Sequence, residues 1–217
     1  MKGLILKDLI NMKKNFRFMS AFALIYVIMA FSMESPGYFS SMFTLVFAML
    51  TLSSYSLDEQ AKWDGYALTM PISRDNVVQG KYLFMLVLNL LGLAMNTVVI
   101  VLMNVIMKAD TIFSGIGGGV IGAAFVILFY SISIPMITKY GVEKSRFILI
   151  AIYMIPFITW LGIFKVLRER YPEPPEALVR MAASLMEYIY LIAPILILVF
   201  LLLSYRITIG IYRKKEF

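Results

Sequence analysis

The chain has 217 residues, of which 61% are hydrophobic and 15% are charged, and its mean hydropathy is +0.84. Soluble domains usually carry about 25% charged residues, so this composition excludes an ordinary soluble domain and indicates a membrane protein. Cysteine and histidine are both absent, which excludes disulfides, thiolate metal sites and the side chain that most often serves as a general base.

Residues 1–17 are predicted to form an amphipathic interfacial helix that lies on the membrane surface with its lysines toward anionic lipid. Its apolar residues recur at helical spacing and are Leu4, Ile5, Leu9, Met12 and Phe16. A cleaved signal peptide is the competing interpretation, because Ala30-Phe31-Ser32 resembles a cleavage site. The charged segment before the first apolar run is long for a signal peptide, so we favour the interfacial helix.

Six apolar segments are predicted to cross a membrane, so we predict an all-α protein with a single membrane domain over residues 1–217. The first segment is short for a crossing, and we expect Phe16 and a snorkelling Arg17 to extend it. The third helix would be about 50 Å long at 1.5 Å per residue, which exceeds the ~30 Å hydrocarbon core, so its first turns must protrude into water. A short charged loop is expected at 139–146. A longer outer loop is expected at 165–187, where Pro175 is placed to begin a short helix. The six spans are predicted at about 18–33, 38–57, 74–107, 112–138, 147–164 and 188–205.

The segment 58–73, between the second and third spans, is the most patterned polar stretch in the first half of the chain. Four of its residues fall at i, i+3, i+4 and i+7 and so share one face of a helix: Trp63, Tyr66, Ala67 and Met70. Pro71 disfavours helical structure at the residue before it, so the helix should end at Met70. A helix of this kind between two spans has an apolar face that must be covered, and we expect a partner protein to dock there.

A second helix is predicted to begin directly after this break. Ser73 offers a hydroxyl as N-cap, and Asp75 lies in the positively polarised first turn. Ile72 and Val77 occupy the two positions of a hydrophobic staple. The segment is therefore predicted to be a short amphipathic helix, a sharp break, and then a rigid start of the third span.

The distribution of basic residues predicts the orientation of the chain. With six spans, 15 Lys and Arg lie on the side that holds both termini and 5 lie on the opposite side. The positive-inside rule then places both termini and the segment 58–73 in the cytoplasm. The formal charge of +7 would by itself suggest nucleic acid. Because the charges lie where membrane topology requires them, we expect no nucleic-acid partner.

Five glycines gather at the start of the fourth span. Gly117, Gly119 and Gly122 satisfy GxGxxG, but no strand precedes them and they lie in an apolar run, so a dinucleotide site is excluded. Gly115 with Gly119, and Gly118 with Gly122, make two overlapping GxxxG pairs. We expect these pairs to serve close helix packing.

Three asparagines on the third span, Asn89, Asn96 and Asn104, are spaced so that they share one face. Each is costly against lipid and needs a partner. The structural interpretation is interhelical hydrogen bonding, which we favour, and the functional interpretation is a weakly polar stripe along a substrate path.

Two absences restrict how the chain could drive transport. No ionisable residue lies in the middle of a predicted span, although ion-coupled transporters usually need one. The sequence also has no GxxxxGK[ST] motif, so it cannot bind ATP through a P-loop. We therefore expect no enzymatic activity and no cofactor in this chain, and any uphill transport must be energised by another subunit.

The segment from Asp58 to Tyr82 resembles the KWD-x-Y-x-LTMPISR signature of small bacterial permease subunits of type-2 ABC exporters. This group includes permeases similar to the phenol-soluble modulin exporter. The opening MKGLILKDL and the six-span layout extend the resemblance over the whole chain, whereas Gly65 and Gln79-Gly80 depart from the family pattern. The matching residues are Asp58, Glu59, Lys62, Trp63, Asp64, Tyr66, Leu68, Thr69, Met70, Pro71, Ile72, Ser73, Arg74, Lys81 and Tyr82.

The resemblance implies that two permeases pair in the bacterial plasma membrane, and that each docks one ABC ATPase subunit, which holds the ATP and Mg²⁺. It also implies export of hydrophobic or amphipathic cargo such as antimicrobial or cytolytic peptides. A secondary transporter or channel, or a non-transporting membrane scaffold, is the alternative. The docking and coupling residues implied are Asp58, Glu59, Lys62, Trp63, Asp64, Tyr66, Ala67, Leu68, Met70, Pro71, Ile72, Ser73 and Arg74.

Overall fold

A computed structural model describes residues 2–32, 40–107, 112–170 and 176–215. The predicted fold class is confirmed at this level, because within these ranges all regular structure is helical and no strand occurs. In chain order the helices are α1 (Lys2–Asn11), α2 (Lys13–Ser32), α3 (Ser40–Gln60), α4 (Trp63–Ala67), α5 (Arg74–Met107), α6 (Ile112–Tyr140), α7 (Val142–Arg170) and α8 (Glu176–Lys214).

Four helices of the described ranges are long and apolar enough to cross a membrane, which makes the chain a multi-pass membrane protein. The first two predicted spans, in α2 and α3, are not among them, although α2 contains a shorter apolar stretch, Ser20–Met29. The crossing segments are Arg74–Ile106 in α5, Gly115–Tyr140 in α6, Val142–Ile163 in α7 and Ile192–Lys214 in α8.

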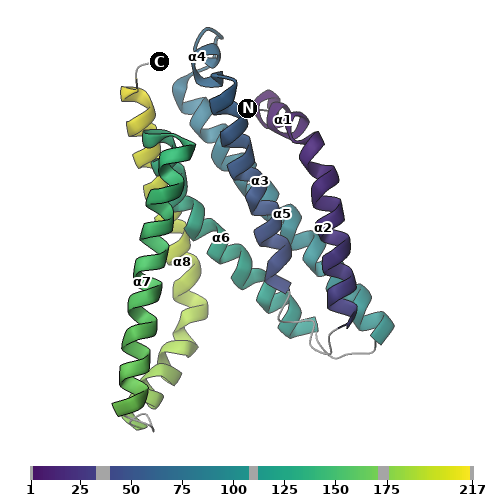
Figure 1. The fold of residues 1–217 in the computed structure, drawn as a ribbon, viewed down its shortest axis with the longest axis vertical. Helices are drawn as coiled ribbons and strands as arrows, with labels where there is room; N and C mark the ends of the chain where they lie inside the picture. Colours follow the sequence, from purple (N-terminus) through teal and green to yellow (C-terminus); the bar gives the residue numbers. More distant parts are fainter. Residues whose placement is uncertain (1, 33–39, 108–111, 171–175, 216–217) are drawn as a thin grey trace.

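Several helix ends gather at one end of the molecule (Figure 1). The N-terminal helix α1, the short helix α4, the junction of α6 with α7, and the end of α8 all lie at one end of the molecule. Helices α1, α2, α3 and α5 form one arm, α7 and α8 lie in the other, and α6 crosses between the two arms. Of the helices in the second arm, α8 packs on α6 and α5, whereas α7 packs mainly on α6.

The core joins α3, α5, α6 and α8 through apolar packing and a few hydroxyl groups. Tyr130 of α6 is almost fully buried and donates a hydrogen bond to the carbonyl oxygen of Ala48 in α3. Tyr82 of α5 is hydrogen-bonded through its hydroxyl to Ser204 at 2.6 Å and to Thr208 at 2.8 Å, both in α8. These hydroxyl groups therefore join neighbouring helices through hydrogen bonds inside the core.

Three predicted boundaries are wrong. The helix expected over 1–17 ends at Asn11, and α2 then runs from Lys13 into the first predicted span. The charged loop expected at 139–146 is helical except for Gly141, because a glycine with φ +82° turns the chain within one residue. The helix expected in the outer loop is not separate, since α8 is continuous from Glu176 to Lys214; Pro175 lies outside the described residues.

Candidate functional site

The short helix α4 is smaller than the sequence predicts. It is entered through Lys62, whose φ of 48° is left-handed, and it ends at Ala67 rather than at Met70. Beyond Ala67 the chain continues in tight turns, with the Met70 N–H donating to the Ala67 carbonyl at 3.3 Å. The Thr69 hydroxyl donates to the Tyr66 carbonyl at 2.8 Å and so takes an acceptor that a longer helix would use. Together with the restriction that Pro71 imposes, this ends the helix three residues early.

The four residues predicted to share one outward face of α4 do not all point the same way. Ala67 is fully buried and Trp63 is half-buried, packed on the core that joins α3, α5, α6 and α8. Tyr66 points outward and is 59% exposed, and Met70 is half-buried. The helix is therefore anchored through Trp63 and Ala67 and presents Tyr66 to its surroundings.

The start of α5 has the local structure that the sequence predicts. Ser73 accepts a hydrogen bond from the Asn76 N–H at 3.2 Å, which caps the helix, and Asp75 lies in its first turn. Ile72 packs on the cluster that contains Val77, as a hydrophobic staple would.

The start of α5 is also tied to the end of α8. Arg213 donates from Nε to Asp75 Oδ1 at 2.9 Å and pairs with the other carboxylate oxygen as well. Arg74 donates to the backbone carbonyls of Tyr212, at 3.5 Å, and of Arg213. A pairing of this fork-like kind fixes the relative orientation of its partners as well as their separation.

A buried cluster of two lysines and two aspartates, here called the charge cluster, joins α1, α3 and α5. Lys7 Nζ lies 2.7 Å from Asp58 Oδ1 and 3.0 Å from Asp8 Oδ1. Lys81 Nζ lies 2.6 Å from Asp58 Oδ2, 3.2 Å from Asp8 Oδ1 and 2.6 Å from the Ser54 hydroxyl. All four charged side chains are at most 18% exposed. Paired in this way, the charges cancel, which is what allows them to be buried.

The sequence did not predict the charge cluster. Asp58 was identified as a motif match and docking residue and Lys81 as a motif match, and α1 was expected to lie on the membrane surface. One signal was present: Asp8 interrupts the apolar face of α1, and it is 3% exposed, while Met12 one turn later is fully buried. Lys7 also lies 4.2 Å above the ring of Trp63. Helix α1 is thus packed on the protein at this end.

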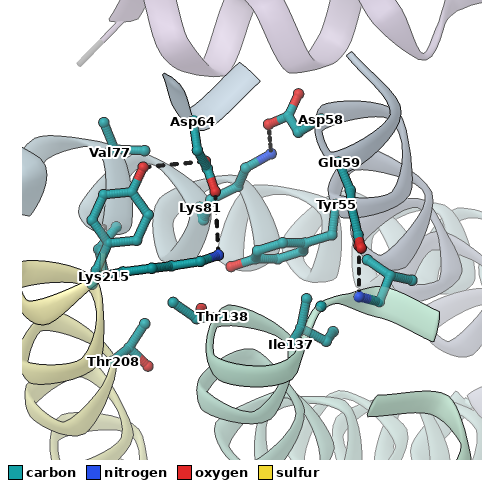
Figure 2. A pocket seen from close by; sticks show the side chains of 14 residues that line it. Tyr55, Asp58, Glu59, Asp64, Val77, Lys81, Ile137, Thr138, Thr208 and Lys215 are labelled. Carbon is teal, nitrogen blue, oxygen red and sulfur yellow. Dashed lines mark hydrogen bonds and ion pairs between the residues drawn. The ribbon is translucent and has the colours of Figure 1, made fainter. Parts of the chain in front are cut away.

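Three further contacts connect the segment 58–73 to the second arm (Figure 2). Asp64 accepts a hydrogen bond from the hydroxyl of Tyr212, in the last turn of α8, at 3.1 Å, and lies 3.7 Å from Nζ of Lys215, which directly follows α8. Glu59 accepts a hydrogen bond from the Val142 N–H, the first residue of α7, at 2.6 Å. The segment therefore contacts α1, α5, α7 and α8.

The pocket in Figure 2 lies where these contacts meet, between α3, α5, α6 and α8. Its volume is about 110 Å³, and its lining includes Asp58, Asp64 and Lys81 together with Tyr55 and Thr138. A volume of this size holds a few water molecules, which each occupy ~30 Å³ in the liquid, and excludes a nucleotide or a peptide. Among the described residues no group of acidic side chains is arranged to hold a metal ion.

The predicted packing residues bring α5 and α6 together. Asn89 donates to the Ala123 carbonyl at 3.0 Å, and Asn96 donates to the Gly115 carbonyl at 3.4 Å. A Cβ on Gly119 would overlap the Asn96 amide, and one on Gly115 would lie 2.7 Å from Ile100. These glycines therefore serve packing within the chain. Asn104 and Gly118 are half-buried, and Gly122 is buried.

The remaining predicted residues of the segment 58–73 are not part of these contacts. Lys62 and Pro71 are exposed, and Leu68 is half-buried. The structure thus divides the predicted set into residues that anchor the segment to other helices and residues that face outward. Those that anchor it are Asp58, Glu59, Trp63, Asp64, Ala67, Ile72 and Arg74.

Comparison with known families decides what kind of protein this is. The sequence matches the family described as ABC-2 family transporter protein over residues 3–213. The chain belongs to this family. The permease is thus a membrane subunit of an ABC transporter, and its family works with an ABC ATPase. Searches of curated proteins and of solved structures give no significant match. The family favours a permease over the secondary transporter, channel or scaffold that composition left open.

Proposed function

We propose that the permease is half of an ATP-driven exporter in a bacterial plasma membrane. Two copies, or one copy and a paralogue, pair with two ABC ATPase subunits, which bind ATP and Mg²⁺ and carry out the hydrolysis. The cargo is hydrophobic or amphipathic, with antimicrobial or cytolytic peptides as the leading class. Like the permeases of the phenol-soluble modulin exporter that its signature resembles, this chain contributes the membrane pathway and no catalytic residue.

We propose six spans, α2, α3 and α5–α8, with both termini in the cytoplasm. An even number of crossings is supported by the arrangement in Figure 1, where α1 and the end of α8 lie at the same end as α4. Exposed basic residues lie at this end too, among them Lys62, Lys139, Lys144 and Lys214. Their position supports the cytoplasmic assignment of this end.

The observation that carries the docking proposal is the outward position of Tyr66. Helix α4 lies at the extreme end of the molecule (Figure 1), and Tyr66 is 59% exposed there while its neighbour Ala67 is fully buried. A large aromatic side chain held outward by an anchored helix is the kind of residue that dominates the energy of a protein contact. Tyr66 is therefore proposed as the main anchor for the ATPase subunit.

The contacts around α4 suggest how ATPase movement reaches the membrane. A displacement of the segment 58–73 acts on α5 through Ser73 and Arg74, and on α8 through Asp64. Both α5 and α8 contain a segment that is long and apolar enough to cross the membrane. A rigid movement at the docking site therefore changes how these two helices are arranged in the membrane. In this proposal α5 and α8 line the transport pathway, so the wall of the pathway shifts with each ATPase cycle.

Substitution of Tyr66 by alanine tests the docking proposal. Loss of an anchor of this kind typically costs about 2 kcal/mol, so the dissociation constant of the permease–ATPase complex should rise about 30-fold. The measurement is co-purification and titration of the ATPase against the permease in lipid nanodiscs. Tyr140→Ala is the matched control, since Tyr140 is also an exposed tyrosine, on α6 at the same end. If Tyr66→Ala binds the ATPase as tightly as the control does, α4 is not the docking element.

The cargo proposal has its own test. Proteoliposomes that contain the permease and its ATPase should accumulate a dye-labelled, 20-residue amphipathic helical peptide when ATP and Mg²⁺ are added outside. A slowly hydrolysed ATP analogue is the control. Absence of ATP-dependent accumulation of this peptide, with ATP hydrolysis intact, would remove amphipathic peptides from the cargo class.

A further inference from the structure

The junction between α6 and α7 consists of a single residue. Gly141 has φ +82°, its N–H donates to the Ile137 carbonyl at 2.8 Å, and its carbonyl accepts from the Ser145 N–H at 3.2 Å. It therefore ends one helix and begins the next. Because glycine has no side chain, it cannot cap the free N–H groups that open α7.

Glu59, at the end of α3, supplies the missing cap. Its Oε2 accepts a hydrogen bond from the Val142 N–H at 2.6 Å, and its Oε1 lies 2.7 Å from where a Cβ on Gly141 would be placed. The carboxylate thus occupies the space that the glycine leaves open. A negative charge is favoured at a helix N-terminus, and a charged hydrogen bond is stronger than a neutral one.

This contact joins the docking segment to a helix that buries little of its surface within the chain. Only 6% of the crossing window of α7 is buried, against 39% for α5 and 44% for α6. Glu59 follows Asp58 of the charge cluster directly and precedes the left-handed turn at Lys62 that leads into α4. Glu59 thus lies between the turn that leads into α4 and the first turn of α7.

We infer that Glu59 is a positioning residue that delivers movement of the docking segment to α7, by a route separate from α5. The inference rests on the proposed function, because it requires an ATPase that moves the segment 58–73. Helix α5 is moved through its own covalent and capping connection at Ser73. Helix α7 is moved by the Glu59 carboxylate, which pulls on the Val142 N–H.

The test uses two fluorescent probes, each on a single introduced cysteine, because the native chain has none. One probe is placed at Gln79 on α5 and the other at Lys144 on α7, both exposed. In the assembled permease–ATPase complex in nanodiscs, both probes should change their emission when ATP and Mg²⁺ are added. With Glu59→Ala, the α5 probe should respond as before, and the α7 probe should lose most of its response, because the charged hydrogen bond that joins Glu59 to α7 is gone.

Two further variants separate coupling from folding. Glu59→Gln, which keeps an oxygen that can accept from the Val142 N–H, should retain more of the α7 response than Glu59→Ala does. Glu143→Ala, which removes an exposed acid from the first turn of α7, should leave both responses unchanged. A purely structural role would lower the unfolding temperature of Glu59→Ala and leave both probe responses intact.

The outcomes distinguish this inference from the proposed function. If the α7 probe responds normally in Glu59→Ala, the inference is overturned while the exporter proposal stands. If the ATPase does not bind the native permease, or neither probe responds to ATP, the proposed function fails first. A loss of both responses in Glu59→Ala would also overturn the inference, because it would make α5 and α7 depend on one route.

Discussion

Replacing Lys81 by methionine should destabilise the permease strongly. The charge cluster is neutral as built, with two lysines against two aspartates. Without Lys81, Asp8 and Asp58 share only Lys7, at 3.0 Å and 2.7 Å, and the Ser54 hydroxyl loses its partner at 2.6 Å. Removing one member of a buried ion pair lowers the free energy of unfolding by about 3–5 kcal/mol, because an uncompensated charge is left behind. We expect a loss of about 3 kcal/mol, since the Lys81 side chain is 10% exposed and Lys7 still supplies partial compensation.

The double variant Lys81→Met with Asp8→Asn tests whether the uncompensated charge causes the loss of stability. It restores neutrality and leaves the Lys7–Asp58 pair, so it should be more stable than Lys81→Met alone, although it carries one more change. Lys139→Met is the control, because Lys139 is exposed at the same end of the molecule. The measurement is the free energy of unfolding in mixed detergent micelles. The reasoning is refuted if Lys81→Met is as stable as the control, or if the second substitution lowers the stability further.

Two further predictions concern packing and topology. Gly119→Ala should cost about 1–3 kcal/mol by overpacking, because its Cβ would overlap the Asn96 amide. Gly117→Ala, with nothing within 4 Å, should be neutral or stabilising by up to about 1 kcal/mol in the same unfolding assay. Equal stabilities of the two variants would contradict the close approach of α5 and α6. A cysteine at Lys62 should be protected from a membrane-impermeant thiol reagent in whole cells and one at Glu173 should react, so labelling at Lys62 from outside would reverse the proposed orientation.

Much of the local structure could be predicted because it depends on neighbours in the sequence. The Ser73 cap lies three residues from the N–H that it accepts, and the apolar runs of α5 to α8 are visible as composition. Some errors have local causes, such as the turn at Gly141 and the early end of α4 after Ala67. Other predictions went wrong where distant parts of the chain decide the outcome. Helix α4 shows both cases: its existence follows from the spacing of apolar residues, whereas the outward position of Tyr66 follows from the core that receives Ala67.

The charge cluster shows why part of the site could not be predicted. Lys7 and Asp58 are 51 residues apart, and Asp8 and Lys81 are 73 residues apart. A helical pattern specifies which residues share a face, but it does not specify which other helix that face meets. Asp8 on the apolar face of α1 indicated that a partner was needed, and only the packing of α1 on α3 and α5 supplied it.

The sequence by itself determined that this is a helical membrane protein, where the polar segment 58–73 interrupts it, and how α5 begins. These features depend on hydrophobic periodicity, on proline and on capping hydroxyls, all of which act within a few residues. The tertiary structure decided which side of α4 is free, which charges cancel, and that Glu59 caps a helix beginning 83 residues later. Those outcomes depend on how helices distant in the chain pack together. A charge or an N–H group that is buried away from water needs a partner within the protein, and here that partner lies on another helix.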